Sequence, residues 1–132
     1  MNTPPAIRAG MVSVILVNYR GAEDTVTCLR SFAGVDWPAG RLELLVVDNA
    51  SGDGSAERIR AEVPGARVIE SDVNRGCAGG CNLGAAEATG EYLACINNDA
   101  RPGADWITAA VEFLDTQADV AAVASKVLDW EG

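Results

Sequence analysis

Residues 91–99 read EYLACINND, an apolar run that ends abruptly in polar residues. The apolar part, residues 92–96, has the length and composition of a buried β-strand. Asn97, Asn98 and Asp99 follow it. Because ligands of open α/β sheets bind beyond the carboxyl ends of the strands, Asp99 is a candidate ligand for a divalent cation that holds a diphosphate. Asn and Asp also begin ordinary loops, so the other loops of the chain must decide between the two interpretations.

The composition of the 132-residue chain is typical of one compact domain. Hydrophobic residues make up 48% and aromatic residues 5%, which indicates a core of Val, Leu, Ile and Ala, like that of parallel sheets covered by helices. No apolar run approaches the roughly 20 residues that a membrane-spanning helix needs. The sequence therefore predicts no transmembrane segment.

The net charge is −9, from 10 Lys and Arg against 19 Asp and Glu, and the sequence contains no basic block. We therefore expect no nucleic-acid partner and no docking on anionic lipid. An acidic chain that binds a diphosphate needs a local countercharge, and a bound cation would supply it.

The four cysteines, Cys28, Cys77, Cys81 and Cys95, are scattered over the expected helices and strands, and no secretory leader is recognisable. We expect free, buried thiols in a reducing cytoplasm. Cys77 and Cys81 could form half of a metal site. The chain has no His and no second close pair of cysteines, so the sequence does not favour a structural zinc.

Strand and helix patterns alternate along the chain and are joined by short loops. This alternation predicts an α/β fold, a mostly parallel sheet with helices on both faces and the first strand at its centre. Residues 1–10 are expected to be loose, and residues 11–132 to form the domain. We expect strands at residues 11–17, 42–47, 66–70, 92–96 and 120–124, and helices at residues 23–32, 56–62, 85–89 and 104–116.

The loop that follows the second expected strand, residues 48–55, carries two carboxylates and two glycines. Such a loop is rich in groups that bind a polar ligand. Asp53 or Ser55 is expected to cap the next helix by accepting its free amide protons. Asp48 is assigned to the ligand.

Residues 74–84 read NRGCAGGCNLG, and we expect this glycine-rich segment to precede a helix rich in alanine. Bare amides at a helix amino terminus can hold a phosphate. Neither GxGxxG nor GxxxxGK[ST] is present, so the dinucleotide and P-loop interpretations fail on spacing. One interpretation of the glycines is that they let the backbone approach an anion closely, with Arg75 as the cation. Tight packing of the helix on the sheet explains the glycines equally well.

Four segments taken together resemble the family 2 glycosyltransferases of the GT-A fold, and in particular bacterial rhamnosyltransferase-like enzymes. They are VSVILVNYRG at 12–21, VVDNASGDGS at 46–55, NRGCAGGCNLG at 74–84 and INNDARP at 96–102. The resemblance extends over nearly all of residues 12–130. It implies transfer of a sugar from a nucleotide diphosphate donor, a UDP- or dTDP-sugar, to an acceptor hydroxyl.

The resemblance also implies a nucleotide-binding site. Asn18 and Tyr19 would border the nucleobase pocket. Asp48 would accept a hydrogen bond from the pyrimidine ring. Arg75 would lie against the base or the phosphates.

In the position of the family's Asp-x-Asp motif this chain has Asn97, Asn98 and Asp99. The resemblance implies that Asn98 lies near the ribose and that Asp99 binds Mg or Mn. An amide still hydrogen-bonds a ribose hydroxyl but adds no charge, so metal binding should depend mainly on Asp99. Affinity for the free ion should be low until a diphosphate supplies further oxygens.

The reaction that the resemblance implies is an inverting, metal-assisted displacement in the synthesis of a cell-envelope polysaccharide or glycan, with a glycan or a lipid-linked acceptor. It needs a general base, which the family places in the second half of the domain. No candidate for it is found in this sequence, and residues 126–132 resemble mid-domain sequence. We therefore expect a donor-binding fragment of a longer protein that works in the cytoplasm, at the inner face of the membrane.

Two functions without catalysis are the alternatives. A receiver-like signalling module would also have a carboxylate, such as Asp48, at a strand end, but it needs an acidic pair after the first strand, where this chain has Asn18 and Tyr19. A scaffold or dimerisation module would leave an apolar sheet edge open to a second copy. A homodimer without nucleotide binding would favour the scaffold.

Overall fold

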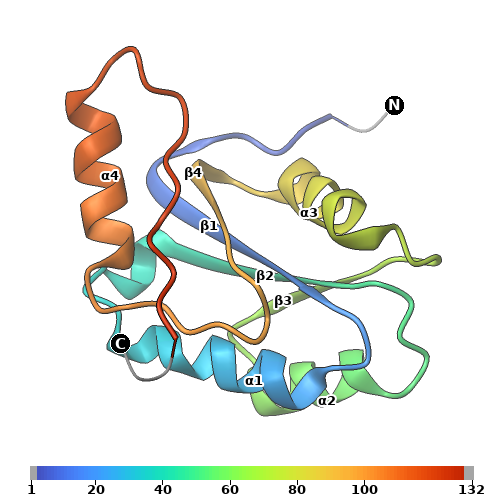
Figure 1. Cartoon of the computed structure of the whole chain (residues 1–132). Coiled ribbons are helices and arrows are strands. Elements are labelled where there is room, and N and C mark those ends of the chain that lie inside the picture. The colour runs from blue at the N-terminus through green and yellow to red at the C-terminus, as the bar shows by residue number, and fades with distance from the viewer. Residues whose placement is uncertain (1–2, 130–132) are drawn as a thin grey trace.

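The computed structural model describes residues 3–129 and forms one sheet covered by helices (Figure 1). The strands are β1 Arg8–Asn18, β2 Leu42–Asp48, β3 Arg67–Glu70 and β4 Gly90–Cys95. The helices are α1 Ala22–Ser31, α2 Ser55–Glu62, α3 Gly76–Glu87 and α4 Trp106–Thr116, with short 3-10 helices η1 Phe32–Gly34 and η2 Ala39–Arg41.

The sheet has the strand order β3-β2-β1-β4, and all its pairings are parallel. The β-branched run of β1 pairs with a strand at each edge, and helices cover both its faces, so that Val14 and Leu16 are fully buried. The predicted parallel α/β sheet with an interior first strand is confirmed.

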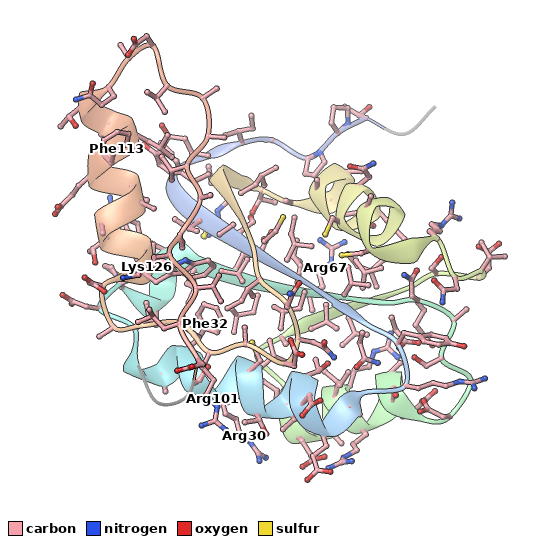
Figure 2. All side chains as sticks on the ribbon, viewed as in Figure 1. Arg30, Phe32, Arg67, Arg101, Phe113 and Lys126 are labelled. Carbon is pink, nitrogen blue, oxygen red and sulfur yellow. The ribbon has the colours of Figure 1, made fainter. Side chains whose placement is uncertain are left out.

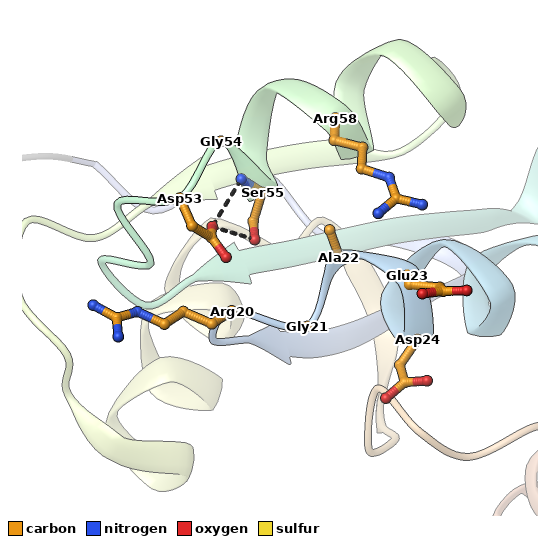
Figure 3. A pocket seen from close by; sticks show the side chains of 9 residues that line it. All are labelled: Arg20, Gly21, Ala22, Glu23, Asp24, Asp53, Gly54, Ser55 and Arg58. Carbon is orange, nitrogen blue, oxygen red and sulfur yellow. Dashed lines mark hydrogen bonds between the residues drawn. The ribbon is translucent and has the colours of Figure 1, made fainter.

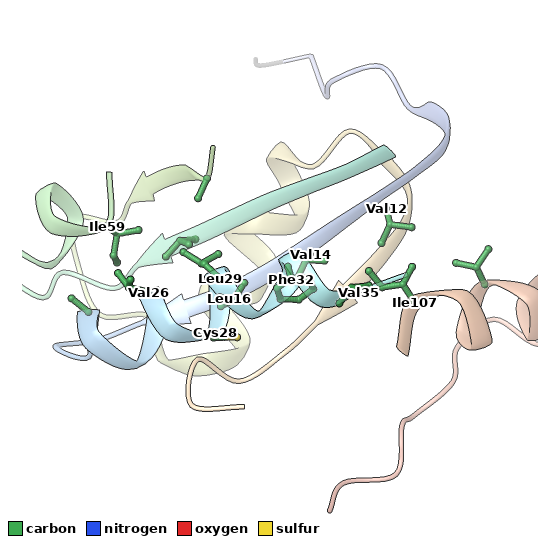
Figure 4. Close-up of a cluster of buried hydrophobic side chains, with 14 residues drawn as sticks. Val12, Val14, Leu16, Val26, Cys28, Leu29, Phe32, Val35, Ile59 and Ile107 are labelled. Carbon is green, nitrogen blue, oxygen red and sulfur yellow. The ribbon is translucent and has the colours of Figure 1, made fainter. Parts of the chain in front are cut away.

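Successive residues of β1 point to opposite faces of the sheet and so build two cores. Val12, Val14 and Leu16 pack with residues of α1, α2 and α4 on one face (Figure 4). Ile15 packs on the other face with Ala85 of α3. Helices therefore cover both faces, as predicted, with α3 on the opposite side from α1 and α2 (Figure 1). No helix in the described part of the chain has the length and apolar character needed to cross a membrane.

The glycine-rich segment is itself the first part of α3, which begins at Gly76 rather than at Ala85 as expected. A β-carbon added at Gly84 would lie 2.7 Å from Ile15 Cγ2, and one added at Gly80 would lie 2.9 Å from Val17 Cγ2. These glycines let the helix lie directly on β1. Glycine has a low helix propensity, and for this reason the sequence pattern predicted a loop. Packing of the helix on the sheet outweighs that propensity.

We expect Gly84→Ala to destabilise the fold. The added methyl group must displace Ile15 or the helix, and overpacking of this kind costs about 1–3 kcal/mol. The gain from better helix propensity is about 1 kcal/mol at most, so the loss should prevail. Gly65→Ala is the control, because a β-carbon there meets nothing within 4 Å. Urea unfolding of both variants tests this, and a Gly84 variant as stable as the control would contradict it.

The part of the chain after β4 differs most from expectation. The expected strand at residues 120–124 is absent, and residues 117–129 contain neither helix nor strand. The amide of Val120 donates to the carbonyl of Gln117 and closes a turn. A run of apolar residues becomes a strand only when a sheet edge pairs with it, and here the segment returns along α4 instead (Figure 1).

Helix α4 begins at Trp106, slightly later than expected, and buries a different face. Its buried residues are Ile107 and Val111. The apolar spacing in residues 104–116 predicts Trp106, Ala109, Ala110, Phe113 and Leu114 on the inner side. Ala109 is instead exposed, and Phe113 has 49% of its surface exposed (Figure 2). An α-helix repeats every 3.6 residues, so a predicted apolar stripe that is shifted by one residue from the buried stripe faces solvent.

The N-terminal boundary also differs from expectation. The predicted loose segment 1–10 is shorter, because β1 already begins at Arg8, whose amide donates to the carbonyl of Thr89 over 2.7 Å. Residues 1–2 and 130–132 lie outside the described residues, and with them Trp130 and the last residues of the expected domain 11–132.

Candidate functional site

The loops that follow β1, β2 and β4 meet at the carboxyl edge of the sheet. Asn18 at the end of β1 pairs in register with Asp48 at the end of β2. On the other side of β1, Ile15 pairs with Cys95, the last residue of β4. The parallel arrangement thus brings segments from distant parts of the sequence to one edge.

Asp48 is held rigidly at this edge, with only 5% of its surface exposed. Its Oδ1 accepts hydrogen bonds from Asn18 Nδ2 at 2.9 Å and from Ser51 Oγ at 2.6 Å. Its Oδ2 accepts one from the Ser51 amide at 3.3 Å. The carboxylate is therefore oriented by its own loop and by β1, and Oδ2 keeps the larger unused acceptor capacity.

A buried threonine connects this carboxylate with the loop that follows β4. Thr25 Oγ1 donates to Asn18 Oδ1 over 2.6 Å and accepts from Asn98 Nδ2 over 3.1 Å. Hydrogen bonds therefore run from Asp48 through Asn18 and Thr25 to Asn98. Sequence reasoning missed Thr25. The available signal was a hydroxyl among the apolar residues of the inner face of α1.

A hollow of about 440 Å³ opens between the end of β1, the start of α3 and the loop after β4. Two of the predicted site residues, Tyr19 and Asn98, line it. Tyr19 has 48% of its surface exposed, and the guanidinium carbon of Arg20 lies over its ring, 5.2 Å from the centroid. The complete lining is Val17, Tyr19, Asn49, Asn74, Gly76, Cys77, Cys81, Cys95, Ile96, Asn97 and Asn98.

Asn49 is a lining residue that sequence reasoning did not single out. It is 2% exposed and clamps the start of α3. Its Nδ2 donates to the Gly76 carbonyl at 2.9 Å, and its Oδ1 accepts from the Arg75 amide at 3.1 Å. Its place directly after Asp48 was the available signal. The loop after β2 therefore also fixes the amino end of α3.

Arg75 is the residue that precedes α3. Its guanidinium donates to Ser71 Oγ at 2.9 Å and to Asp72 at 3.2 Å. About half of the Arg75 side chain is exposed, and Asp72 is more exposed still, so their ion pair is weak and can open for a ligand. Arg75 is not among the described residues that line the hollow.

Asp99 is exposed and follows Asn98 in the loop after β4. Burial, and next to it the negative charge of Asp99, raise the pKa of the Cys28 thiol in α1 to about 11. The sulfur of Cys28 also lies 3.8 Å from the carbonyl oxygen of Asn97. The carboxylate of Asp99 therefore lies close enough to α1 to act on Cys28, and it is not among the residues that line the hollow.

The residues near Asp99 fit a cation that is shared with a ligand. Among the described residues, no group of three or more His, Cys, Asp or Glu side chains could hold a metal ion. Asp99 offers one carboxylate, and its neighbour Asn98 offers an amide. Mg²⁺ is commonly bound by one or two carboxylates together with substrate phosphates, and this donor set suits that mode.

A second hollow, of about 380 Å³, lies between the start of α1 and the start of α2 (Figure 3). Asp53 Oδ1 accepts from the Ser55 amide at 3.0 Å and from Ser55 Oγ at 2.6 Å. The N-cap residue of α2 is Gly54, which makes no side-chain cap hydrogen bond, so the predicted N-cap at Asp53 or Ser55 is wrong, and Asp53 bonds only the first amide of the helix. Arg58, at its rim, pairs with Glu62. The lining mixes both signs of charge, and no other feature of this hollow points to a ligand.

The comparisons with known proteins agree with one another. The family model described as Glycosyl transferase family 2 matches residues 13–131. Glycosyltransferase AglE of Haloferax volcanii is 31% identical over 106 residues, which cover 78% of this chain and 35% of AglE.

Two solved structures share the fold. The mannosyltransferase PcManGT of Pyrobaculum calidifontis, in complex with GDP-Man and Mn²⁺, is 30% identical with a TM-score of 0.72 over 85% of this chain and 34% of its own. Residues 1–349 of S. aureus TarS, in complex with UDP, are 28% identical with a TM-score of 0.66 over 80% of this chain and 32% of that one. The chain thus spans about a third of the length of these proteins.

Proposed function

The chain belongs to glycosyl transferase family 2, and we propose that it binds the nucleotide diphosphate sugar of an enzyme that transfers the sugar to an acceptor hydroxyl. The observation that carries the proposal is the hydrogen-bonded connection from Asp48 through Asn18 and Thr25 to Asn98, the member of this connection that lines the hollow. Support comes from PcManGT, which binds GDP-Man and Mn²⁺, and from TarS, which binds UDP. The receiver-like alternative is set aside, because the family match covers most of the chain.

The nucleoside is proposed to bind along the end of β1. The exposed ring of Tyr19 offers a surface for stacking of the base. Asp48 Oδ2, oriented by Ser51, has acceptor capacity left for an N–H of a pyrimidine. Asn18 acts mainly on Asp48, since it is fully buried. The amide of Asn98 is positioned by Thr25 and is proposed to bond a ribose hydroxyl.

The diphosphate is proposed to lie between Arg75 and Asp99. Arg75 is the cation at the start of α3, and the amino terminus of a helix favours an anion through its dipole. Asp99 would hold Mg²⁺ or Mn²⁺ together with the phosphate oxygens. The bound cation would stabilise the charge on the departing nucleoside diphosphate. The residues of this chain bind and orient the donor.

Inverting displacement is proposed as the reaction, and it needs a general base near the acceptor hydroxyl. The described lining of the hollow contains amides, thiols and a phenol, and no Asp, Glu or His. We propose that the base and the acceptor site lie in the remainder of a longer enzyme, since the chain spans about a third of its relatives. A glycan or lipid-linked acceptor at the cytoplasmic side of the cell envelope is part of the proposal.

Thermal unfolding of the chain with UDP, dTDP or GDP, each with and without Mn²⁺, tests the proposal. A nucleotide at about one hundred times its Kd stabilises a folded protein by about 2.7 kcal/mol, which is a shift of several degrees in Tm. We expect the shift with at least one nucleotide and a larger one with Mn²⁺. Equal shifts with and without the metal would count against the metal assignment, and no shift with any nucleotide would overturn the proposal.

A dimerisation role is the second candidate, and one observation favours it. β4 is an edge strand of the described sheet, and Leu93 on it has 53% of its surface exposed. Exposed edge strands with apolar side chains are prone to pair with another chain. Size-exclusion chromatography of the same samples separates the two functions, because a dimer that binds no nucleotide would support the scaffold.

A further inference from the structure

Three of the cysteines line the hollow together. Cys77 and Cys81 lie on α3, and Cys95 is the last residue of β4. All of them are free thiols, as expected, but the expectation that they are buried is wrong for Cys77 and Cys95, which are exposed, while Cys81 is half-buried. Nothing in the proposed binding of the donor uses these sulfurs. Their convergence on one wall therefore needs a separate explanation.

Cys81 is the member of the cluster that interacts with both others. Burial, then the neighbouring thiols of Cys95 and Cys77, raise the pKa of Cys81 to about 12. Cys81 is thus protonated at neutral pH and is a poor first nucleophile. The exposed thiols of Cys95 and Cys77 are the ones that a reagent in solution reaches.

The two possible partners of Cys81 differ in geometry. Cys77 and Cys81 are four residues apart on one helix, where β-carbons are about 5–6 Å apart. A disulfide needs β-carbons about 3.5–4.5 Å apart, so the pair within the helix is poorly placed. Cys95 belongs to a separate element, and its neighbour in the sheet is Ile15, on which α3 rests through Gly84. The thiol of Cys95 therefore faces the helix across the hollow.

We propose that Cys81 and Cys95 form an oxidation-sensitive site, in which hydrogen peroxide converts the two thiols into a disulfide that ties α3 to β4. The thiolate of Cys95 attacks a peroxide oxygen, the O–O bond breaks, and the distal oxygen leaves as water after protonation. Cys95 is then a sulfenic acid. The sulfur of Cys81 attacks it, loses its proton and displaces the hydroxyl as a second water.

The cross-link would narrow the hollow at the strand end that carries the loop with Asn98 and Asp99. We therefore expect the oxidised chain to bind the nucleotide at least tenfold more weakly, a consequence that rests on the proposed function. The formation of the disulfide itself does not depend on it. The disulfide and its effect on nucleotide binding can therefore be tested, and can fail, independently.

The test is treatment of the whole chain with hydrogen peroxide, followed by mass spectrometry of the intact protein and of its peptides under non-reducing conditions. We expect the loss of two hydrogens and a peptide that joins Cys81 to Cys95. Cys95→Ser should abolish this peptide, and Cys77→Ser should retain it. A link between Cys77 and Cys81, or sulfinic acid on Cys95 without any link, would overturn the proposal.

Nucleotide binding is then compared between the reduced chain, the oxidised chain and the oxidised chain after dithiothreitol. Weaker binding that dithiothreitol restores supports the closure of the hollow. Undiminished binding by the cross-linked chain overturns the closure. If the disulfide forms and the reduced chain binds no nucleotide, the thiol site stands and the proposed donor site fails.

Discussion

Asp99→Asn is expected to remove the metal-dependent part of nucleotide binding and to leave the fold intact. Asp99 is exposed, so the substitution buries no new polar group. It is also the only carboxylate in the run from Asn97 to Asp99, so the variant leaves three amides there. Amide oxygens bind Mg²⁺ or Mn²⁺ without neutralising its charge, and affinity in the presence of the diphosphate should fall at least about tenfold, or about 1.4 kcal/mol.

The measurement is the Tm shift that UDP or dTDP gives with and without Mn²⁺. In the variant, the shift with the metal should fall to the shift without it. Asp119→Asn is a matched control, because Asp119 is also exposed and lies in the turn after α4. It should behave as the unaltered chain does. A variant of Asp99 that keeps the whole increment from Mn²⁺ would show that the cation is held elsewhere.

The strands were predictable because their residues need little context. The β-branched runs of β1 and β2 are typical of strands in a parallel sheet that helices cover on both faces, and polar residues mark where each run ends. The carboxyl edge of the sheet then follows from parallel pairing. The roles of Tyr19 and Asn98 came from the family resemblance and stay predictions, and both residues line the hollow at this edge.

The errors fall where the outcome depends on a partner far away in the sequence. The glycines of α3 favour a loop by propensity alone, and only the contact of Gly84 with Ile15 makes a helix the better arrangement. The apolar residues 120–124 have the composition of a strand but gain no strand partner in the described structure. Local pattern cannot supply either fact.

The sequence analysis missed two site residues for the same reason. Thr25 matters because it lies between Asn18 and Asn98, which is 73 positions away. Asn49 matters because it holds the start of α3, 27 positions away. Each looks ordinary in the sequence, since threonine and asparagine are common in helices and loops. Their roles exist only once the sheet has brought the loops together.

Asp48→Ala is expected to cost both stability and nucleotide binding. The carboxylate is almost completely buried and accepts hydrogen bonds from Asn18 and from the hydroxyl and amide of Ser51. A buried donor that loses its acceptor costs about 1–3 kcal/mol. The Nδ2 of Asn18 is such a donor, with Ser51 Oγ at 3.4 Å as its other contact. The free energy of unfolding, measured with a chemical denaturant, should therefore fall by about 1–3 kcal/mol or more.

Asp48→Asn separates the two effects, because the amide oxygen can keep the bonds from Asn18 and Ser51 Oγ, which both go to Oδ1. The new amide nitrogen takes the place of Oδ2, the atom proposed to accept from the base, and gives up the long 3.3 Å bond from the Ser51 amide. A donor then faces the N–H of the pyrimidine, so binding should weaken while most of the stability remains. Calorimetry with UDP and urea unfolding of both variants decide the matter. If Asp48→Asn binds UDP as the unaltered chain does, then Asp48 supports the loop and does not contact the base.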